Sequence, residues 1–253
     1  MLNNITKDKA MDENKETNSF KNITPGGDEK DDGINKNSPS STRDSIQLPR
    51  RFFHMSAGIC VGAIYQAFLT RQMAVSFLGI AACIMYLIEQ IRINYPEYSG
   101  NINILNKHFL RAEEQLRESA AIPYCMAILL TIISFPKSIA LVAIYTLAIG
   151  DPMSALVGIK YGKHKLIKKK SLEGSLAFFI SSFIITFLIF RPMNPDLLGM
   201  TLGLSFLMAF LITCFELIPL RLDDNLTIPL AAATILWLLT AFFNISYTYG
   251  PGL

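Results

Sequence analysis

The chain has 253 residues, of which 51% are hydrophobic, with a formal net charge of +3 and a mean hydropathy of +0.35. This composition is too apolar for an ordinary soluble domain and excludes that class. All four cysteines lie in apolar stretches without CxxC spacing, which excludes a disulfide framework or a cysteine metal site and predicts small buried side chains.

Residues 1–49 differ in composition from the rest of the chain. They hold seven Lys/Arg against nine Asp/Glu and almost no apolar residues. Such a segment buries too little apolar surface to offset the entropy lost on ordering, so we expect a disordered tail. No apolar signal-peptide region lies near Met1, so we expect no cleaved leader.

From residue 50 onward, apolar blocks alternate with polar loops. Seven blocks are visible, at residues 54–69, 73–93, 120–135, 138–159, 174–190, 197–218 and 226–245. Most approach the roughly 20 residues that a helix needs to cross a bilayer, although the first and the third are short. The sequence therefore predicts an all-α, multi-pass integral membrane domain over residues 50–253, with about seven transmembrane helices.

The charges of the loops predict the orientation of these helices. Lys and Arg concentrate on the cytoplasmic side of membrane proteins. Placing the tail inside leaves only Arg71, Lys137 and Arg191 in the external loops. We therefore expect a cytoplasmic tail, an external C-terminus, and loops 92–119 and 160–170 together at the cytoplasmic face.

Two polar clusters precede the middle of the chain. Arg50, Arg51 and His54 open the first apolar block, where they either anchor the helix or bind an anion. In residues 105–118 apolar side chains recur at helical spacing, so we expect one amphipathic interfacial helix there. Its Glu114 is either a solvated surface charge or a metal ligand or base.

The third cluster, Gly150-Asp151-Pro152, interrupts the apolar block that begins at residue 138. Because proline lacks an N–H and clashes with the preceding turn, we expect the helix to kink or restart with Asp151 as N-cap. An ionisable residue at membrane depth is costly and by default indicates a functional site. Small residues continue from Asp151 to Gly158 and Gly162, a face that another backbone or a phosphate can approach closely.

A basic segment follows this face. It contains Lys160, Lys163, His164, Lys165, Lys168, Lys169 and Lys170. Such segments usually set orientation or contact anionic lipids. Beside a cavity-facing carboxylate, however, lysines for phosphate oxygens and a carboxylate for Mg²⁺ are the groups that phosphoryl transfer needs. Ser171 is the expected N-cap of the next helix, with Glu173 in its first turn.

The fourth cluster, Asp223-Asp224-Asn225, opens the last apolar block, and Glu216 lies near the end of the block before it. One such residue suffices to cap a helix, so capping leaves two of the three unexplained. Asp and Asn oxygens are ligands that Mg²⁺ prefers, usually together with substrate phosphates. We therefore expect a metal or nucleotide site here.

The motifs of soluble kinases are absent, because the sequence has no GxxxxGK[ST] loop and no HRD or DFG motif. It also lacks the HExxH motif of zinc proteases. The segments GDPMSALVGIKYGKHK, KKSLEGSLA and LDDNLTIPL instead resemble, in this order, the polyprenol kinase family of membrane lipid kinases, which includes dolichol kinases, phytol kinases and CTP-dependent diacylglycerol kinases. RRFFHMSAG and LRAEE resemble further segments of that family, so the resemblance spans about residues 50–235.

The resemblance implies transfer of the γ-phosphoryl group of CTP to a lipid hydroxyl, with Mg²⁺ or another divalent cation such as Ca²⁺. By position it implies catalytic roles for Asp151, Glu173 and Asp224. The candidate metal ligands are Asp151, Asp223, Asp224 and Glu114. The candidate nucleotide or phosphate contacts are Arg50, Arg51, His54, Gly158, Gly162, Lys163, Lys165, Lys170 and Asn225.

The best-matching acceptor is diacylglycerol, with phytol or a polyprenol such as dolichol or undecaprenol as alternatives. A phosphatidate cytidylyltransferase-type enzyme and an anion transporter are further alternatives. The transporter explains less well why every polar cluster lies at one face. We expect a lipid alcohol, a nucleoside triphosphate and membrane lipids as partners, with no nucleic acid, and a site facing the cytoplasm in an ER or bacterial inner membrane.

Overall fold

The computed structural model describes residues 47–94, 121–167, 170–219 and 223–246, and the side chains within them from residue 51 onward. Three expectations lie outside the described residues: the disordered tail, the amphipathic helix that carries Glu114, and the side chain of Arg50. These three stay predictions.

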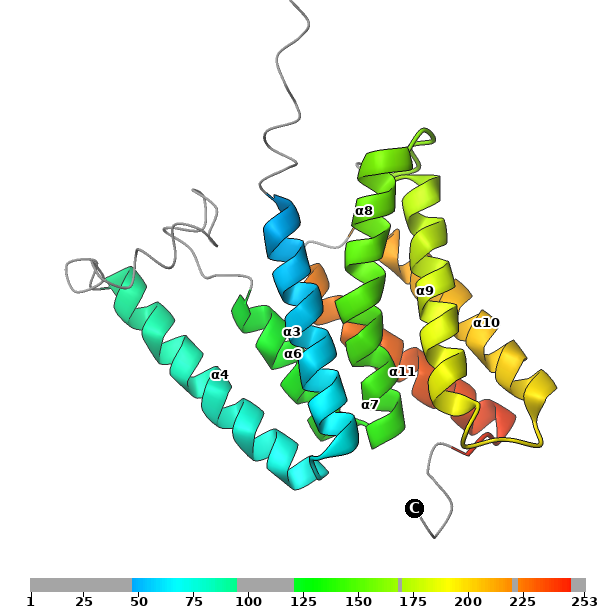
Figure 1. Cartoon of the computed structure of the whole chain (residues 1–253), viewed down its shortest axis with the longest axis horizontal. Helices are drawn as coiled ribbons and strands as arrows, with labels where there is room; N and C mark the ends of the chain where they lie inside the picture. The colour runs from blue at the N-terminus through cyan, green and yellow to red at the C-terminus, as the bar shows by residue number, and fades with distance from the viewer. Residues whose placement is uncertain (1–46, 95–120, 168–169, 220–222, 247–253) are drawn as a thin grey trace, which may run out of the picture. The chain divides into compact units, whose positions relative to one another are not determined.

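Every apolar block that the sequence predicts to be helical contains a helix (Figure 1). The helices are α3 (Gln47–Ala67), α4 (Arg71–Asn94), α6 (Ala121–Ser134), α7 (Lys137–Tyr145), the π-helix η2 (Thr146–Gly150), α8 (Asp151–Tyr161), α9 (Leu172–Phe190), α10 (Leu198–Glu216) and α11 (Asp224–Phe243). The β pairing found in the described ranges is one isolated antiparallel bridge, between Lys165 and Ser171. The all-α expectation is therefore confirmed.

Five helical stretches are long and apolar enough to cross a membrane: α4, the continuous stretch α7–η2–α8, α9, α10 and α11. The shorter α6 has 14 residues, fewer than the roughly 20 that a span requires. The structure therefore supports five of the seven expected spans. The other two helices, α3 and α6, are those that contain the two short apolar blocks.

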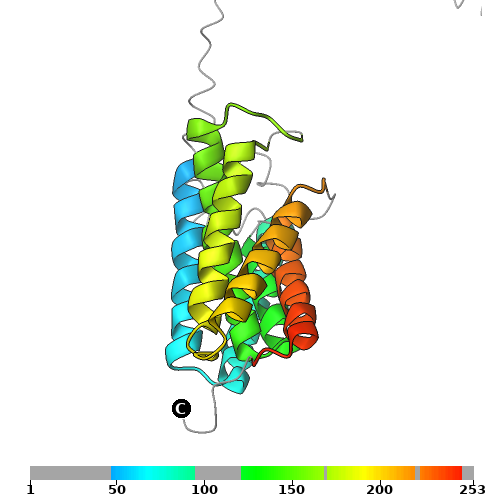
Figure 2. The same ribbon diagram turned by 90° about the vertical axis from the view of Figure 1, so that its right-hand side faces the viewer.

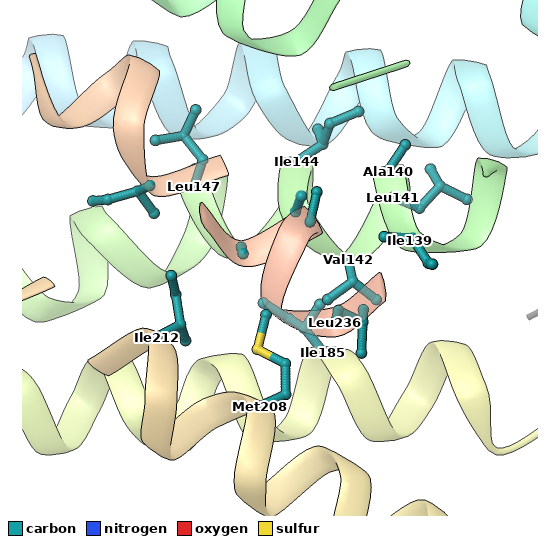
Figure 3. Close-up of a cluster of buried hydrophobic side chains, with 14 of the residues drawn as sticks. Ile139, Ala140, Leu141, Val142, Ile144, Leu147, Ile185, Met208, Ile212 and Leu236 are labelled. Carbon is teal, nitrogen blue, oxygen red and sulfur yellow. The ribbon is translucent and has the colours of Figure 1, made fainter. Parts of the chain in front are cut away.

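The centre of the bundle is α7, whose residues from Ser138 to Ile144 are all buried. Side chains of the other helices complete the surrounding cluster, among them Ile185 of α9, Met208 of α10 and Leu236 of α11 (Figure 3). Because η2 and α8 continue directly from α7, this packing fixes the position of the Gly-Asp-Pro segment.

The outer surface of the bundle is apolar, as contact with lipid requires. Large exposed side chains include Phe77 and Leu87 of α4. Cys60, Cys83 and Cys214 are also exposed, so the expectation of buried cysteines is wrong for these three. An apolar block in a membrane helix does not reveal which of its faces meets lipid, which is why burial could not be predicted from it.

One end of the bundle collects the polar segments. Figures 1 and 2 show the N-terminal ends of α3, α9 and α11 at the same end as the C-terminal ends of α8 and α10. The C-terminal end of α11 lies at the opposite end. This arrangement agrees with the expectation of one shared face for the three polar clusters that lie in the described ranges, whereas the cytoplasmic orientation of that face stays a prediction.

Candidate active site

Asp151 lies within a continuous helix and does not start a new one. The π-helical turn η2 joins α7 to α8, and Asp151 has helical dihedral angles, φ −63° and ψ −49°. A π turn contains one extra residue, which accommodates Pro152 where it cannot donate a hydrogen bond to the carbonyl four residues back. The expected restart with Asp151 as N-cap is therefore wrong. Single π turns of this kind occur frequently at functional sites.

Four charged side chains interact electrostatically with Asp151. They are Arg51, Lys170, Glu216 and Asp224. Arg51 comes from the first turns of α3, Lys170 from the loop before α9, Glu216 from the last residue of α10 and Asp224 from the first residue of α11. We call these residues together with Asp151 the Asp151 cluster. It consists of two cations and three carboxylates, which come from five segments and lie within electrostatic range of Asp151.

The contact between Lys170 and Glu216 is the best defined within the cluster. The Lys170 ammonium lies 2.6 Å from Glu216 Oε1 and also donates a hydrogen bond to the backbone carbonyl of Glu216. Glu216 is buried, with 5% of the residue exposed. This contact joins the basic segment to the end of α10.

Two buried charged atoms of the cluster have no hydrogen-bond partner among the described residues: Nη1 of Arg51 and Oε2 of Glu216. Buried polar groups without a partner are rare, and charged ones are costly. The cluster therefore offers one open donor and one open acceptor. An anion that approaches Arg51 and a cation or donor group that approaches Glu216 would satisfy them.

The basic segment folds back on itself before α9. The N–H of Leu166 donates to the carbonyl of Lys170, and the N–H of Leu172 donates to that of His164. His164 Nδ1 lies 2.9 Å from Oε1 of Glu173, and the His164 N–H also donates to the Glu173 carboxylate. The structure thus places Glu173, an expected catalytic residue, against His164.

The expected phosphate-binding lysines are found in different surroundings. Lys170 belongs to the Asp151 cluster. Lys163 and Lys165 are exposed on the folded-back loop, while Lys168 and Lys169 lie outside the described residues. A phosphate role for the two exposed lysines stays a prediction.

The small-residue face of α8 packs against the start of α9. Ser171 is the N-cap of α9, as predicted, and its Oγ accepts a hydrogen bond from the N–H of Gly174. A Cβ built on Gly158 would lie 3.1 Å from Ser171 Oγ, and one on Gly162 would lie 2.8 Å from the same atom. Of the two expectations for these glycines, the contacts support close approach of a second backbone.

Replacement of Gly174 by alanine is expected to destabilise the protein. The added Cβ would lie 2.7 Å from the backbone carbonyl oxygen of Ser154, an atom that cannot move without shifting α8. The strain should lower the stability by about 1–3 kcal/mol. Gly203→Ala in α10 is the matched control, because a Cβ there meets nothing within 4 Å. The melting temperatures of the two detergent-solubilised variants check this, and an unchanged Gly174→Ala protein would contradict it.

His54 is held near the cluster by Tyr124 of α6. The Tyr124 hydroxyl donates to the backbone carbonyl of His54 at 3.0 Å, and the two rings meet edge to face with centroids 5.0 Å apart. Tyr124 also interacts electrostatically with Asp151. A Cβ on Gly58 would lie 2.0 Å from the Tyr124 hydroxyl, so this glycine permits the approach.

Several known proteins are similar in sequence to this chain over most of its length. The chain is 28% identical to CTP-dependent diacylglycerol kinase 1 of Schizosaccharomyces pombe over 204 residues, which cover 76% of this chain and 93% of that protein. It is 26% identical to the protein of the same name from Eremothecium gossypii over 215 residues, 78% of this chain and 68% of that one. It is 32% identical to a probable chloroplastic phytol kinase of Triticum aestivum over 207 residues, 76% and 67% of the two chains.

The chain belongs to the polyprenol kinase family of lipid kinases. No family model matches it. No solved structure matches it either.

A lipid kinase needs a site for phosphate groups. Asp223 and Asp224, at the start of α11, make different contacts and are therefore not equally available for such a site. Asp223 is the N-cap of α11, and its Oδ1 accepts a hydrogen bond from the N–H of Asn225 at 2.9 Å. Asp224 instead interacts with Asp151. The structure therefore brings Asp224 into the cluster and gives Asp223 a capping contact.

The residues of the cluster fit a divalent cation only in part. In the described ranges no group of three or more His, Cys, Asp or Glu side chains could hold a metal ion. Mg²⁺ commonly takes one or two protein carboxylates and completes its shell with water and substrate phosphates. Asp151 and Asp224 are the pair that the lipid kinase could offer in this way.

Two residues of the site were not assigned a role from the sequence. Glu216 is the one charged residue in its apolar block, a signal that by itself indicates a functional site. Tyr124 gave no such signal, because a tyrosine in an apolar block is common at membrane interfaces. Its contact with α3 is visible only in the folded lipid kinase.

Proposed function

We propose that this lipid kinase transfers the γ-phosphoryl group of CTP to the hydroxyl of diacylglycerol. The observation that carries the proposal is the match to the S. pombe CTP-dependent diacylglycerol kinase 1 over 93% of that protein's length. The Asp151 cluster supports it, since it combines cations with carboxylates inside an apolar bundle. The excess of Lys and Arg in the loops at this end supports a cytoplasmic site.

In the proposed reaction, the lipid oxygen forms a bond to the γ-phosphorus of CTP. The bond from that phosphorus to the bridging oxygen breaks, and its electron pair leaves with CDP. The hydroxyl proton passes to the carboxylate of Asp151. Arg51 and Lys170 bind the phosphate oxygens and hold the nucleotide in position, since phosphoryl transfer depends mainly on positioning and electrostatics.

A divalent cation bound by Asp151 and Asp224 would supply further neutralisation of the phosphates. The residues present are compatible with such a site but do not complete it without substrate oxygens. The rest of the positive charge that neutralises the nucleotide phosphates would come from Arg51 and Lys170 of the chain itself.

The test is a transfer assay with purified protein and a panel of lipid alcohols. CTP or ATP carries the label in its γ-phosphate, and the panel contains diacylglycerol, phytol, dolichol and undecaprenol. We expect labelled phosphatidic acid with CTP and release of CDP. A parallel reaction offers phosphatidate with CTP labelled in its cytidine. Transfer of that label to phosphatidate with release of pyrophosphate, and no transfer of the γ-phosphate to any alcohol, would identify a cytidylyltransferase and overturn the proposal.

Phytol is the second candidate acceptor. The relative from Triticum aestivum, a probable phytol kinase, is 32% identical to this chain. Both acceptors present a primary hydroxyl next to a long apolar body, so the same site chemistry serves either one. Label in phytol and not in diacylglycerol would select this candidate.

A further inference from the structure

The Lys170 side chain is held by the last residue of α10. Its ammonium contacts two acceptors of Glu216, the carboxylate oxygen Oε1 and the backbone carbonyl oxygen. Helix C-termini attract cations because their last carbonyls are unpaired and carry partial negative charge. A lysine ammonium has three donors, so one further donor of Lys170 is available for a ligand.

A purely structural salt bridge does not account for this arrangement. Oε2 of Glu216 is buried and lacks a hydrogen-bond partner among the described residues. Glu216 also repels Asp151, with which it interacts electrostatically. Both features cost stability, which a neutral hydrogen-bonding side chain at position 216 would avoid. The negative charge at this position therefore requires a reason other than bridging the loop to α10.

We propose that Glu216 is a positioning residue, which holds the Lys170 ammonium beside Asp151 where it meets the phosphates of the nucleotide. The inference rests on the proposed function. Lys170 lies at the end of a loop whose other described side chains, from Lys163 to Ile167, are exposed. Without the Glu216 carboxylate, the ammonium keeps only the backbone carbonyl of residue 216 as a hydrogen-bond acceptor in the described part of the chain. The ammonium would then rotate away from the site, and the nucleotide would bind more weakly.

The test compares Glu216→Gln with Lys170→Met and with the double variant. Glutamine keeps the size of the side chain and one acceptor but removes the charge. We expect Glu216→Gln to raise the KM for CTP about tenfold and to change kcat much less, because a lysine on the phosphates binds ground state and transition state alike. The double variant should bind CTP no more weakly than Lys170→Met alone, because the charge at position 216 acts on CTP only through the Lys170 ammonium.

The same variants separate this inference from a structural role. A structural bridge predicts a lower melting temperature for Glu216→Gln with a wild-type KM, and that result would overturn the inference. The inference would also be overturned if the two single variants weakened CTP binding equally and the double variant showed the sum of the two losses in binding free energy. If the unchanged protein phosphorylates no lipid with any nucleotide, the proposed function fails. If it is active and Glu216→Gln keeps its affinity for CTP, only the positioning role fails.

Discussion

Asp151→Asn is expected to abolish lipid phosphorylation while the protein still inserts and accumulates. The substitution preserves side-chain volume and leaves the π turn unchanged, so the packing of α7 and α8 should persist. It removes the carboxylate with which the other four charged residues of the cluster interact electrostatically. Loss of a general base or of a central charge typically costs on the order of 10²–10⁴ in rate. Labelled phosphate transferred per milligram of folded protein measures this loss.

Asp196→Asn is the matched control for this substitution. Asp196 is exposed in the connection between α9 and α10. Figure 2 shows this connection at the end of the bundle opposite to the C-terminal end of α8. The control should keep wild-type turnover and wild-type melting temperature. Full activity of Asp151→Asn would remove the cluster from the mechanism and leave the half-buried Asp151 carboxylate without a function.

The positions of the helices were predictable because each apolar block is long and continuous. Length and hydropathy are local properties, and they identified the elements that became α4, α9, α10 and α11. The same rules failed at Pro152, where local reasoning predicts a kink or a new helix start and the helix does not restart. The π turn Thr146–Gly150 absorbs the proline without a break, and its formation depends on the packing of a buried helix, which no local pattern reports.

The composition of the site was predictable in outline, whereas its pairings were not. Asp151, Lys170 and Asp224 follow from their unusual positions in or beside apolar blocks. The contact of Lys170 with Glu216 joins residues 46 positions apart, so it depends on how α10 lies against the loop before α9. Gly158 illustrates the same limit, because small residues suit either a phosphate or a helix, and only the fold shows Ser171 and Gly174 beside it.

Substitution of Asp223 and of the adjacent Asp224 should have different effects: we expect loss of turnover at Asp224 and loss of stability at Asp223. Asp224→Asn removes a charge from the cluster and is expected to lower the turnover number about 100-fold or more without loss of stability. Asp223→Ala removes the N-cap of α11, which should lower stability by about 1 kcal/mol and leave turnover within a few-fold of wild type. Melting temperature and turnover of each variant are the two measurements.

Asp223→Ser makes the comparison decisive, because serine preserves a cap oxygen for the N–H of Asn225 but carries no charge. We expect this variant to recover the stability that Asp223→Ala loses and to retain activity. If Asp223 were instead a metal ligand, as the sequence alone allows, serine would restore stability but not turnover, and the divalent-cation requirement would shift in both Asp223 variants. Two observations favour the first outcome: one Asp223 oxygen accepts the capping N–H of Asn225, and Asp224 rather than Asp223 interacts with Asp151.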